Sequence, residues 1–423
     1  MKTTLYAITI FLCSALLLVL EVVAGRLIAP YVGVSLYTWT AVIGIILAGL
    51  SLGFWIGVVW ADRGADERSA AFTLLGSSVA SFSIPLIITI VAPTIQTNEM
   101  SLLTSSLLLV LSLFFIPAVL LGVVTPLLTT LALKLSNRTG HIVGMMHALA
   151  AVGSIFGTFI TGYWLIQQFG TRNVILGTSV LLAILAIPLL KGKKTTATLP
   201  VMLLMFSLVT ITTVTRDGFA EPCQEETQYF CIRVIEEPWE MPQGIIKSMV
   251  LDHLLHGVNH NSEPALLVSP YVHLMDEIVL EYFKETSNLS FFFIGGGAYT
   301  LPRAIQKTSP QADITVAELD PEVTWIAKRD MNVDTSTMNI LHTDARIHLQ
   351  KETRKFDVII GDAFHDIAIP PHLVTLEMAG LIKNKLNEDG IYILNVVDAF
   401  PSSKMVIAIM KTLKSEFKYV DAW

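Results

Sequence analysis

Long apolar stretches occupy the first half of the chain. Most of them are long enough, as helices, to cross a hydrocarbon layer of about 30 Å, so the pattern predicts seven membrane-spanning helices. The predicted spans lie near residues 5–24, 38–60, 71–93, 102–133, 142–166, 173–190 and 199–215. The first is not a cleavable signal peptide, because it continues through Glu21 and Arg26 into the next span without a small-residue cleavage site. The fourth contains Pro117 and Pro126, which predict a kink, a tilt or a portion outside the bilayer.

Glycines recur every four residues in two of these stretches. The second stretch contains Gly49, Gly53 and Gly57, and the fifth contains Gly153 and Gly157. Small residues at this spacing let helix backbones approach closely, so we expect them to form helix-packing faces rather than a transport path.

Short β-rich runs alternate with amphipathic helical runs from Phe291 onward. The predicted strands are Phe291–Ile294, Ile314–Glu318, Asn339–His342, Phe356–Ile360 and Ile391–Val397. Predicted helices include Pro321–Asp330, Leu373–Leu386 and Ser402–Phe417. This alternation predicts a parallel sheet with helices on both faces, which binds ligands at the carboxyl ends of its strands.

Composition separates the two halves in the same way. Of 423 residues, 53% are hydrophobic and 15% charged, against about 45–50% and 25% in soluble domains. Residues 1–216 carry a net charge of +6 and the remaining residues −13. We therefore expect an α-helical polytopic membrane domain at 1–216, a small β-rich extension with a connecting helix at 217–290, and an α/β Rossmann-like domain at 291–423. Nucleic acid is not an expected partner, because phosphate binding needs a basic surface.

The basic residues of the first half bear on its orientation. Eight lie in loops on the side of the N terminus, and only Arg26 and Arg172 lie in the opposite loops. The eight are Lys2, Arg63, Arg68, Lys134, Arg138, Lys191, Lys193 and Lys194. This bias predicts a cytoplasmic N terminus. Seven spans then place the second half outside the cytoplasm, whereas six or eight place it inside.

Three cysteines, Cys13, Cys223 and Cys231, are too few for a disulfide scaffold. Cys223 and Cys231 either pair in an oxidising compartment or are two unrelated thiols. We favour unrelated thiols, because strand residues eight apart bridge only if the chain folds back between them.

A glycine-rich turn follows the first predicted strand of the second half. Gly295, Gly296 and Gly297 permit a tight turn and close approach of the backbone to a ligand, and a helical run follows. At the end of the next strand, Glu318 is placed to accept both hydroxyls of a ribose. Two further strands are followed by Asp344 and Asp362, each of which alone could be a helix cap or a solvated loop acid. Together the four strand ends predict a site for a nucleoside-type cofactor.

These motifs carry a family resemblance. The segments GGGAYTLPR (295–303), AELDPEV (317–323), TDAR (343–346) and DAFHDIAIPPHLVTLE (362–377) resemble the spermidine synthase branch of the class I methyltransferase fold. The first half is similar to the membrane segment of the membrane-fused spermidine synthase-like proteins. The residues that carry this likeness are 21–30, Trp39, 49–53 and 61–63. Residues 226–229 and 251–256 resemble the β-rich N-terminal extension of these synthases.

The resemblance implies an adenosyl sulfonium donor, S-adenosylmethionine or its decarboxylated form. Gly295, Gly296 and Gly297 would flank its sulfonium end, Glu318 would bind its ribose, and Asp344 with Ala345 its adenine. Asp362 would orient the acceptor amine and accept its proton as nitrogen attacks the carbon next to sulfur. Asp366 is the second candidate catalytic acid. The expected substrate-binding residues are Tyr229, Asp252, His256, Tyr271, Tyr299 and His365.

Two local patterns depart from this scheme. Soluble synthases follow their glycines with an aspartate that holds the donor's amine, whereas this chain has Ala298. The spacing of His253 and His256 would suit a metal on a helix, but we prefer acceptor-pocket or loop histidines and expect no metal site.

The leading hypothesis is a membrane-bound transferase that moves an aminopropyl or related group from the donor to an amine. The alternatives are a methyltransferase acting on a lipid or membrane-proximal substrate, and a transporter or sensor that binds a polyamine or nucleoside without chemistry. The expected partners are the lipid bilayer, a small-molecule amine or lipid substrate, and a second copy of the chain in a homodimer. We expect a multi-pass protein of the inner (plasma) membrane. Donor supply favours the cytoplasmic side for the second half, against the seven-span count.

Overall fold

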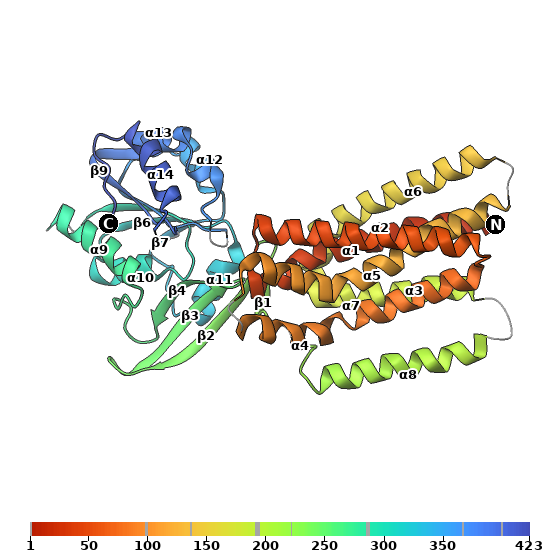
Figure 1. Cartoon of the computed structure of the whole chain (residues 1–423). Coiled ribbons are helices and arrows are strands. Elements are labelled where there is room, and N and C mark those ends of the chain that lie inside the picture. Colours follow the sequence, from red (N-terminus) through yellow and green to blue (C-terminus); the bar gives the residue numbers. More distant parts are fainter. Residues whose placement is uncertain are drawn as a thin grey trace. The chain divides into compact units, whose positions relative to one another are not determined.

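A computed structural model describes residues 2–97, 100–135, 138–190, 195–220, 222–284, 288–365, 368–398 and 401–423 (Figure 1). The chain forms two compact units, Met1–Pro222 and Cys223–Trp423. The first unit is helical, and the second contains both β-sheets.

The helical unit is built from long apolar helices. They are α1 (Lys2–Val32), α2 (Leu36–Asp62), α3 (Glu67–Phe82), α4 (Ile84–Thr97), α5 (Leu102–Leu133), α6 (Thr139–Ile160), α7 (Ile166–Ala186) and α8 (Thr195–Val214). Polar side chains cap the beginnings of α2, α3 and α5; at α3, Asp66 accepts a hydrogen bond from the backbone N–H of Ser69 (3.1 Å). The side chain of Ser35 accepts a hydrogen bond from the backbone N–H of Thr38 (3.2 Å), and Ser101 accepts one from Thr104 (3.3 Å). Helix α5 continues through both prolines as one helix.

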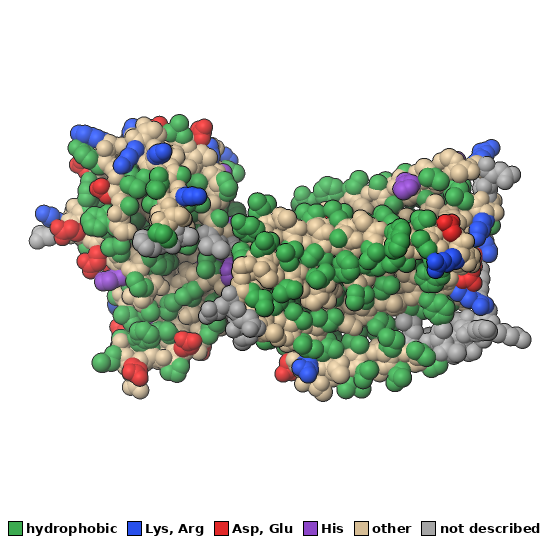
Figure 2. Space-filling view, in the orientation of Figure 1, with side chains coloured by type: hydrophobic (Ala, Val, Ile, Leu, Met, Phe, Trp, Pro, Cys, Tyr) green, Lys and Arg blue, Asp and Glu red, His purple; other side chains and the backbone are tan. Residues whose placement is uncertain are grey.

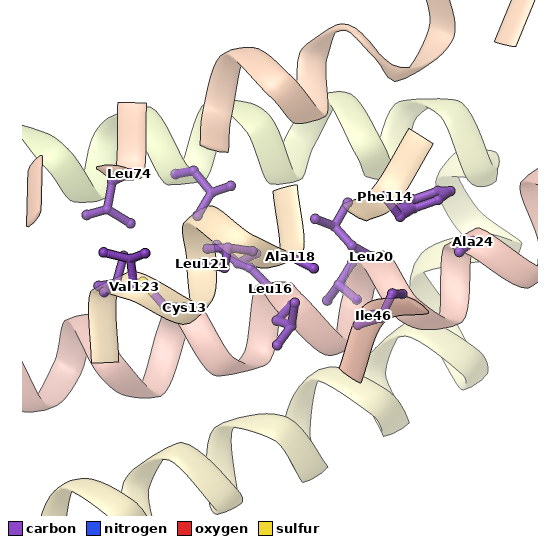
Figure 3. Close-up of a cluster of buried hydrophobic side chains, with 14 of the residues drawn as sticks. Cys13, Leu16, Leu20, Ala24, Ile46, Leu74, Phe114, Ala118, Leu121 and Val123 are labelled. Carbon is purple, nitrogen blue, oxygen red and sulfur yellow. The ribbon is translucent and has the colours of Figure 1, made fainter. Parts of the chain in front are cut away.

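A buried hydrophobic cluster holds the helices together. Figure 3 shows side chains of α1, α2, α3 and α5 meeting in its interior, among them Leu20, Ile46, Leu74 and Phe114. Each of these four is at most 2% exposed. The apolar pattern of the first half therefore supplies both an inner face and an outer surface.

The glycine repeats lie where helices touch. A Cβ atom on Gly53 would lie 2.2 Å from the carbonyl oxygen of Val119 in α5, and one on Gly157 would lie 2.2 Å from that of Ala15 in α1. The other three repeat glycines approach the same partner helices. The predicted packing faces are confirmed, because only glycine allows these backbones so close.

Four helical segments are long and apolar enough to cross a membrane: Lys2–Val32, Leu36–Asp62, Leu102–Leu133 and Thr139–Leu189. The number rises to five if α3 and α4, whose axes are bent by 46° relative to each other, are counted together as one broken span. The predicted number of seven is therefore not confirmed for the described residues. The predicted fifth and sixth spans fall in one segment, Thr139–Leu189, in which Gly170 has a non-helical conformation (φ 72°). In α8, the described side chains form an apolar helix over Leu203–Val214.

The outer surface of the helical unit is apolar. Leu36, Trp55, Tyr163 and Leu204 are each at least half exposed. Figure 2 shows apolar side chains along most of the unit, with charged side chains gathered at the end where the N terminus lies. An apolar surface this continuous is typical of contact with lipid rather than water.

The second unit begins with an antiparallel sheet, as the predicted β-rich extension required. Its strands are β1 (Glu225–Glu226), β2 (Cys231–Trp239), β3 (Gly244–Leu251) and β4 (Leu254–His260), paired in that order. Cys223 and Cys231 form a disulfide with a Cα–Cα distance of 5.2 Å. The preference for unrelated thiols is wrong, because β1 turns back on β2 and pairs Glu226 with Cys231.

A parallel sheet follows, with strand order β7-β6-β5-β8-β9. Its strands are β5 (Ser290–Ile294), β6 (Asp313–Ala317), β7 (Met338–Leu341), β8 (Phe356–Gly361) and β9 (Leu386–Leu394). The helices of this unit are α9 (Pro270–Phe283), α10 (Thr300–Thr308), α11 (Pro321–Asp330), α12 (Ala345–Lys351), α13 (Leu376–Lys385) and α14 (Lys404–Lys414). The strand order reverses direction at β5, between β6 and β8. Ligands of such sheets bind at this point, outside the carboxyl ends of the strands.

The predicted α/β architecture is confirmed, and the first four strands agree with prediction within two residues. The fifth differs: β9 begins at Leu386 rather than Ile391 and ends at Leu394 rather than Val397. Its first half is polar, so it shows no strand pattern. It pairs with β8 across a register shift between Phe356 and Val358.

Candidate functional site

The glycine turn after β5 leaves no room for side chains. Gly295 has a φ of +96°, and a Cβ atom there would lie 2.7 Å from the backbone oxygen of Asp362. A Cβ atom on Gly296 would lie 2.7 Å from the ring of Tyr299. Glycine is therefore required both for the backbone conformation and for the close approach of two strand ends.

Glu318 follows β6 and holds this turn. Its Oε2 accepts hydrogen bonds from the backbone N–H groups of Gly296 (2.8 Å) and Gly297 (3.3 Å), and its Oε1 accepts one from Asp320 (2.9 Å). Burial raises the pKa of the Glu318 carboxyl, and these hydrogen bonds oppose the shift. Each carboxylate oxygen has two acceptor sites, so Oε1 retains one that a ribose hydroxyl can use.

Asp344 lies after β7, where the adenine was expected. Its Oδ1 accepts a hydrogen bond from the backbone N–H of Ile347 (3.0 Å) and caps α12, while its Oδ2 pairs with Nε2 of His372 (2.7 Å). Ala345 next to it is buried. The helix-cap interpretation of Asp344 is therefore correct, and it leaves the expected role at the adenine as a prediction.

Asp362 directly follows β8 and lies beside the glycine turn. Its backbone N–H donates to the carbonyl of Ile294 at the end of β5 (3.0 Å). Its carboxylate accepts hydrogen bonds from the hydroxyl of Tyr271 (3.3 Å, Oδ2) and the side-chain amide of Asn395 (3.0 Å, Oδ1). Burial raises the pKa of Asp362, and the two hydrogen bonds oppose that shift. The result is an oriented carboxylate that binds a proton more readily than a solvated one.

A pocket joins Asp362 to the glycine turn. It encloses about 370 Å³, part of which is open to solvent. The lining residues are His256, Tyr271, Val272, Met275, Phe293, Gly295, Gly296, Ala298, Thr300, Leu301, Pro302, Ile360 and Asp362. The predicted residues Gly295, Gly296, His256, Tyr271 and Asp362 thus share one cavity, although they come from four separate parts of the sequence.

Two expected substrate-binding residues have structural positions instead. Tyr299 is 0% exposed, and its hydroxyl is 2.7 Å from Oγ1 of Thr324. Asp252 is 1% exposed, and its Oδ1 accepts a hydrogen bond from the backbone of Cys231 (3.0 Å). Neither residue is among those that line the pocket described above. Their expected role in substrate binding stays a prediction.

Of the other expected residues, His256 and His365 lie near Phe230. Rings of His256 and His365 lie 6.3 and 6.1 Å from that of Phe230, and Tyr229 is next to Phe230 in the chain. Asp366 lies outside the described residues.

A metal site receives no support from the geometry. Residues 252–260 belong to the turn between β3 and β4 and to β4 itself. His253 and His256 therefore do not share a helical face. Within the described parts of the chain, no group of three or more His, Cys, Asp or Glu side chains is arranged to hold a metal ion.

Several residues of the site were not predicted from the sequence. Asn395 directly follows β9, so its place at a strand end, like that of the acids, was the signal that could have identified it. Val272 and Met275 come from α9, which packs over the pocket. They carry no local signal, because an apolar side chain on an amphipathic helix is ordinarily part of a core.

Comparisons with known proteins agree with this geometry. The spermine/spermidine synthase domain family matches residues 277–423. A polyamine aminopropyltransferase of Vibrio vulnificus is 32% identical over 128 residues, which cover 29% of this chain and 42% of that protein. Polyamine aminopropyltransferase 2 of Aquifex aeolicus is 23% identical over 432 residues, which cover 97% of this chain and 83% of that protein.

A solved structure, that of a probable spermidine synthase from Corynebacterium glutamicum, is similar with a TM-score of 0.43 and 21% identity, covering 46% of this chain and 70% of that chain. A thermospermine synthase of Arabidopsis thaliana is 28% identical over 142 residues, 42% of its length. The chain thus spans less than half the length of the Vibrio and Arabidopsis relatives. With the strand order and the strand-end acids, these matches show that residues 277–423 are similar to the spermine/spermidine synthase domain family and to polyamine aminopropyltransferases.

Proposed function

We propose that the chain is a membrane-bound transferase that moves an aminopropyl group from an S-adenosyl sulfonium donor to an amine acceptor. The observation that carries the proposal is the position of Asp362. Its carboxylate shares a pocket with the glycine turn and is oriented by Tyr271 and Asn395. The names of the relatives, polyamine aminopropyltransferases, agree with this choice.

The residues present fit an adenosyl ligand. The glycine turn is a cradle that any Cβ atom at 295 or 296 would fill. Glu318 lies at its base for the ribose, and Asp344 at the end of the neighbouring strand for the adenine. Decarboxylated S-adenosylmethionine is the donor we propose, because it carries the aminopropyl group.

In the proposed reaction Asp362 accepts a proton from the attacking amine. The amine nitrogen forms a bond to the carbon next to sulfur, that carbon–sulfur bond breaks, and its electron pair stays on sulfur as a neutral thioether. Tyr271 and Asn395 hold the carboxylate so that the proton acceptor and the reacting carbon are aligned. The raised pKa of Asp362 suits a group that must hold a proton during the step.

We also propose that the helical unit is embedded in a bilayer as a multi-pass domain of the plasma membrane. Its exposed apolar side chains and its long apolar helices support this proposal. The sidedness of the second unit is treated below, since the disulfide bears on it.

A methyltransferase is the second candidate, and one observation favours it. Ala298, at the position where soluble synthases hold the donor's amine with an aspartate, is 1% exposed. A Cβ atom on Gly257 would lie 2.6 Å from the Ala298 side chain, so β4 leaves little space for a carboxylate there. Intact S-adenosylmethionine carries its own carboxylate, which an aspartate at this position would repel, so a wall without one suits methyl transfer.

Product analysis distinguishes the two candidates. The full chain, purified in detergent, is incubated with each donor form and with a diamine, and the adenosyl product is identified by mass spectrometry. Methylthioadenosine from the decarboxylated donor supports the proposal. Adenosylhomocysteine from the intact donor supports methyl transfer. Binding of donor without either product supports the sensor alternative, and binding of neither donor contradicts the adenosyl site itself.

A further inference from the structure

A disulfide-closed loop borders the donor site. The bond between Cys223 and Cys231 closes the segment that contains β1 and the turn after it. The segment also contacts β2 through the two-residue pairing of β1, through the backbone N–H of Gln224, which donates to the carbonyl of Ile232 (2.8 Å), and through the Gln224 side chain, which bonds the backbone of Val234. A strand of two residues holds little by itself. The disulfide therefore adds a covalent restraint on where this loop lies.

Thr227 is the inner point of the loop. It is 5% exposed, and its Oγ1 accepts hydrogen bonds from the backbone N–H groups of Tyr229 and Phe230 (3.0 Å each). The same hydroxyl donates to Oδ2 of Asp320. The turn geometry and the contact with Asp320 thus depend on one side chain.

Asp320 bonds both Thr227 and Glu318, and so links the loop to the donor site. It is 2% exposed, its Oδ1 accepts a hydrogen bond from Glu322 at the start of α11 (3.0 Å), and its backbone N–H donates to Glu318. Glu318 in turn accepts from the glycine turn. A continuous chain of hydrogen bonds therefore runs from the disulfide-closed loop to the carboxylate placed for the ribose.

We propose that the loop 223–231 positions the donor site through Thr227 and Asp320, and that the disulfide makes this positioning dependent on an oxidising compartment. The inference rests on the proposed function for the identity of the ligand. Disulfides persist outside the cytoplasm and are reduced within it. The second unit accordingly works on the side opposite the cytoplasm, which is also where seven spans and the loop charges would place it. This replaces the earlier preference for the cytoplasmic side, which rested on donor supply.

Ligand binding tests the positioning role. Methylthioadenosine and decarboxylated S-adenosylmethionine are titrated calorimetrically into the full chain in detergent, before and after reduction by dithiothreitol, which converts the disulfide to two thiols and is itself oxidised to its cyclic disulfide. Among the chain's three cysteines, Cys13 is buried in α1. A change on reduction therefore reports on the 223–231 bond. We expect about tenfold weaker binding after reduction, the effect of losing one hydrogen bond to a charged group.

Substitutions separate positioning from general stability. Thr227→Val should weaken binding to the same extent as reduction and raise the donor KM with kcat unchanged, because Asp362 is untouched. Thr227→Ser keeps the hydroxyl and should restore affinity to within about twofold. Thr308→Val is the matched control, since that hydroxyl donates to the Ala304 carbonyl within its own helix (3.1 Å). The double variant Cys223→Ser/Cys231→Ser should bind weakly and respond no further to dithiothreitol.

The outcomes are distinct. Native affinity in both the reduced protein and Thr227→Val overturns the inference alone. Absence of binding by the oxidised wild type contradicts the proposed function and this inference together.

Thiol labelling tests the compartment. Spheroplasts expressing the full chain are treated with an impermeant maleimide, with or without the impermeant reductant tris(carboxyethyl)phosphine. We expect labelling of Cys223 only when the reductant is present, since Cys231 is 3% exposed. Labelling without reductant, or only after lysis, overturns the assignment to an oxidising compartment.

Discussion

Replacement of Asp362 by asparagine is the sharpest test of the proposed chemistry. Asparagine has the same shape and keeps an oxygen that can accept the hydrogen bond from Asn395. Its amide can donate to the hydroxyl of Tyr271, which now accepts instead of donating. The substitution therefore removes the ability to take a proton while leaving the pocket and the glycine turn in place.

The expected loss follows from this role. A positioned general base contributes about 10²- to 10⁴-fold to a rate, which corresponds to about 2.7–5.4 kcal/mol of activation free energy at 1.36 kcal/mol per tenfold. We expect kcat of Asp362→Asn to fall by about 10³-fold. Donor affinity should stay within about threefold, because the glycine turn that cradles the donor is bonded to the carboxylate of Glu318 and not to that of Asp362.

Stability provides an independent readout of the same side chain. Burial raises the pKa of Asp362 in the folded protein above its value in the unfolded chain. The native state therefore binds the proton more tightly, so the stability that this group contributes is fully present below the unfolded pKa and is lost as pH rises through the folded pKa. Asparagine has no such titration. The thermal midpoint of Asp362→Asn, measured relative to wild type, should therefore rise as the pH is raised above about 4, the pKa of an aspartate in the unfolded chain.

The assays are single-turnover product formation, calorimetric donor binding, and thermal unfolding at several pH values, all on the full chain. Undiminished turnover by Asp362→Asn would refute the assignment of the general base. Loss of donor binding in parallel with turnover would show instead that the side chain builds the pocket.

Three further changes test separate parts of the structure. Glu318→Gln replaces one of the two carboxylate oxygens that accept hydrogen bonds from three backbone N–H groups by an NH2 group, which cannot accept them. The affinity for methylthioadenosine, measured by calorimetry, should fall about tenfold or more, and unchanged affinity would contradict the site. Tyr271→Phe removes a hydrogen bond that lowers the pKa of Asp362, so the acidic limb of the kcat profile should move to higher pH, whereas an unmoved or lowered limb would argue against the pair. Gly157→Leu meets a backbone oxygen of α1, 2.2 Å from where its Cβ would lie, and should destabilise the helical unit by about 1–3 kcal/mol in thermal unfolding. Gly144→Leu, on the same helix with open space around it, is its control, and equal effects of the two would contradict the packing face.

Much of the second unit was predictable because its signals are local. A strand buried on both faces is a continuous apolar run, as in Phe291–Ile294, and a glycine turn or an acid directly after such a run needs no distant information. Parallel strands align their carboxyl ends. The chain order of Gly295, Glu318, Asp344 and Asp362 was therefore enough to place these residues at one edge of the sheet.

The positions of turn residues and the pairing of the cysteines could not be predicted, because they depend on contacts between distant segments. Tyr299 and Asp252 are polar residues in turns, and local sequence does not distinguish a turn that faces a pocket from one that packs inward. The disulfide was misjudged for the same reason, because the reversal that brings Cys223 to Cys231 depends on the pairing of β1 with β2. The predicted number of spans is not confirmed where apolar helices are continuous or bent, since hydropathy reports length and not geometry.

By itself the sequence determined the division into an apolar and an acidic half, the glycine faces of the helices, the α/β alternation and the acids at the strand ends. These follow from side-chain chemistry at short periods, and each is repeated within a few residues. Only the tertiary structure decided that Tyr271 and Asn395 orient Asp362, that His372 pairs with Asp344, and that a disulfide-closed loop reaches Glu318 through Thr227 and Asp320. The contact between Tyr271 and Asp362 joins residues 91 apart in the sequence, and that between Asn395 and Asp362 joins residues 33 apart. The contact between Thr227 and Asp320 joins residues 93 apart. The hydrogen-bond partner of a polar side chain depends on which distant groups the fold brings next to it.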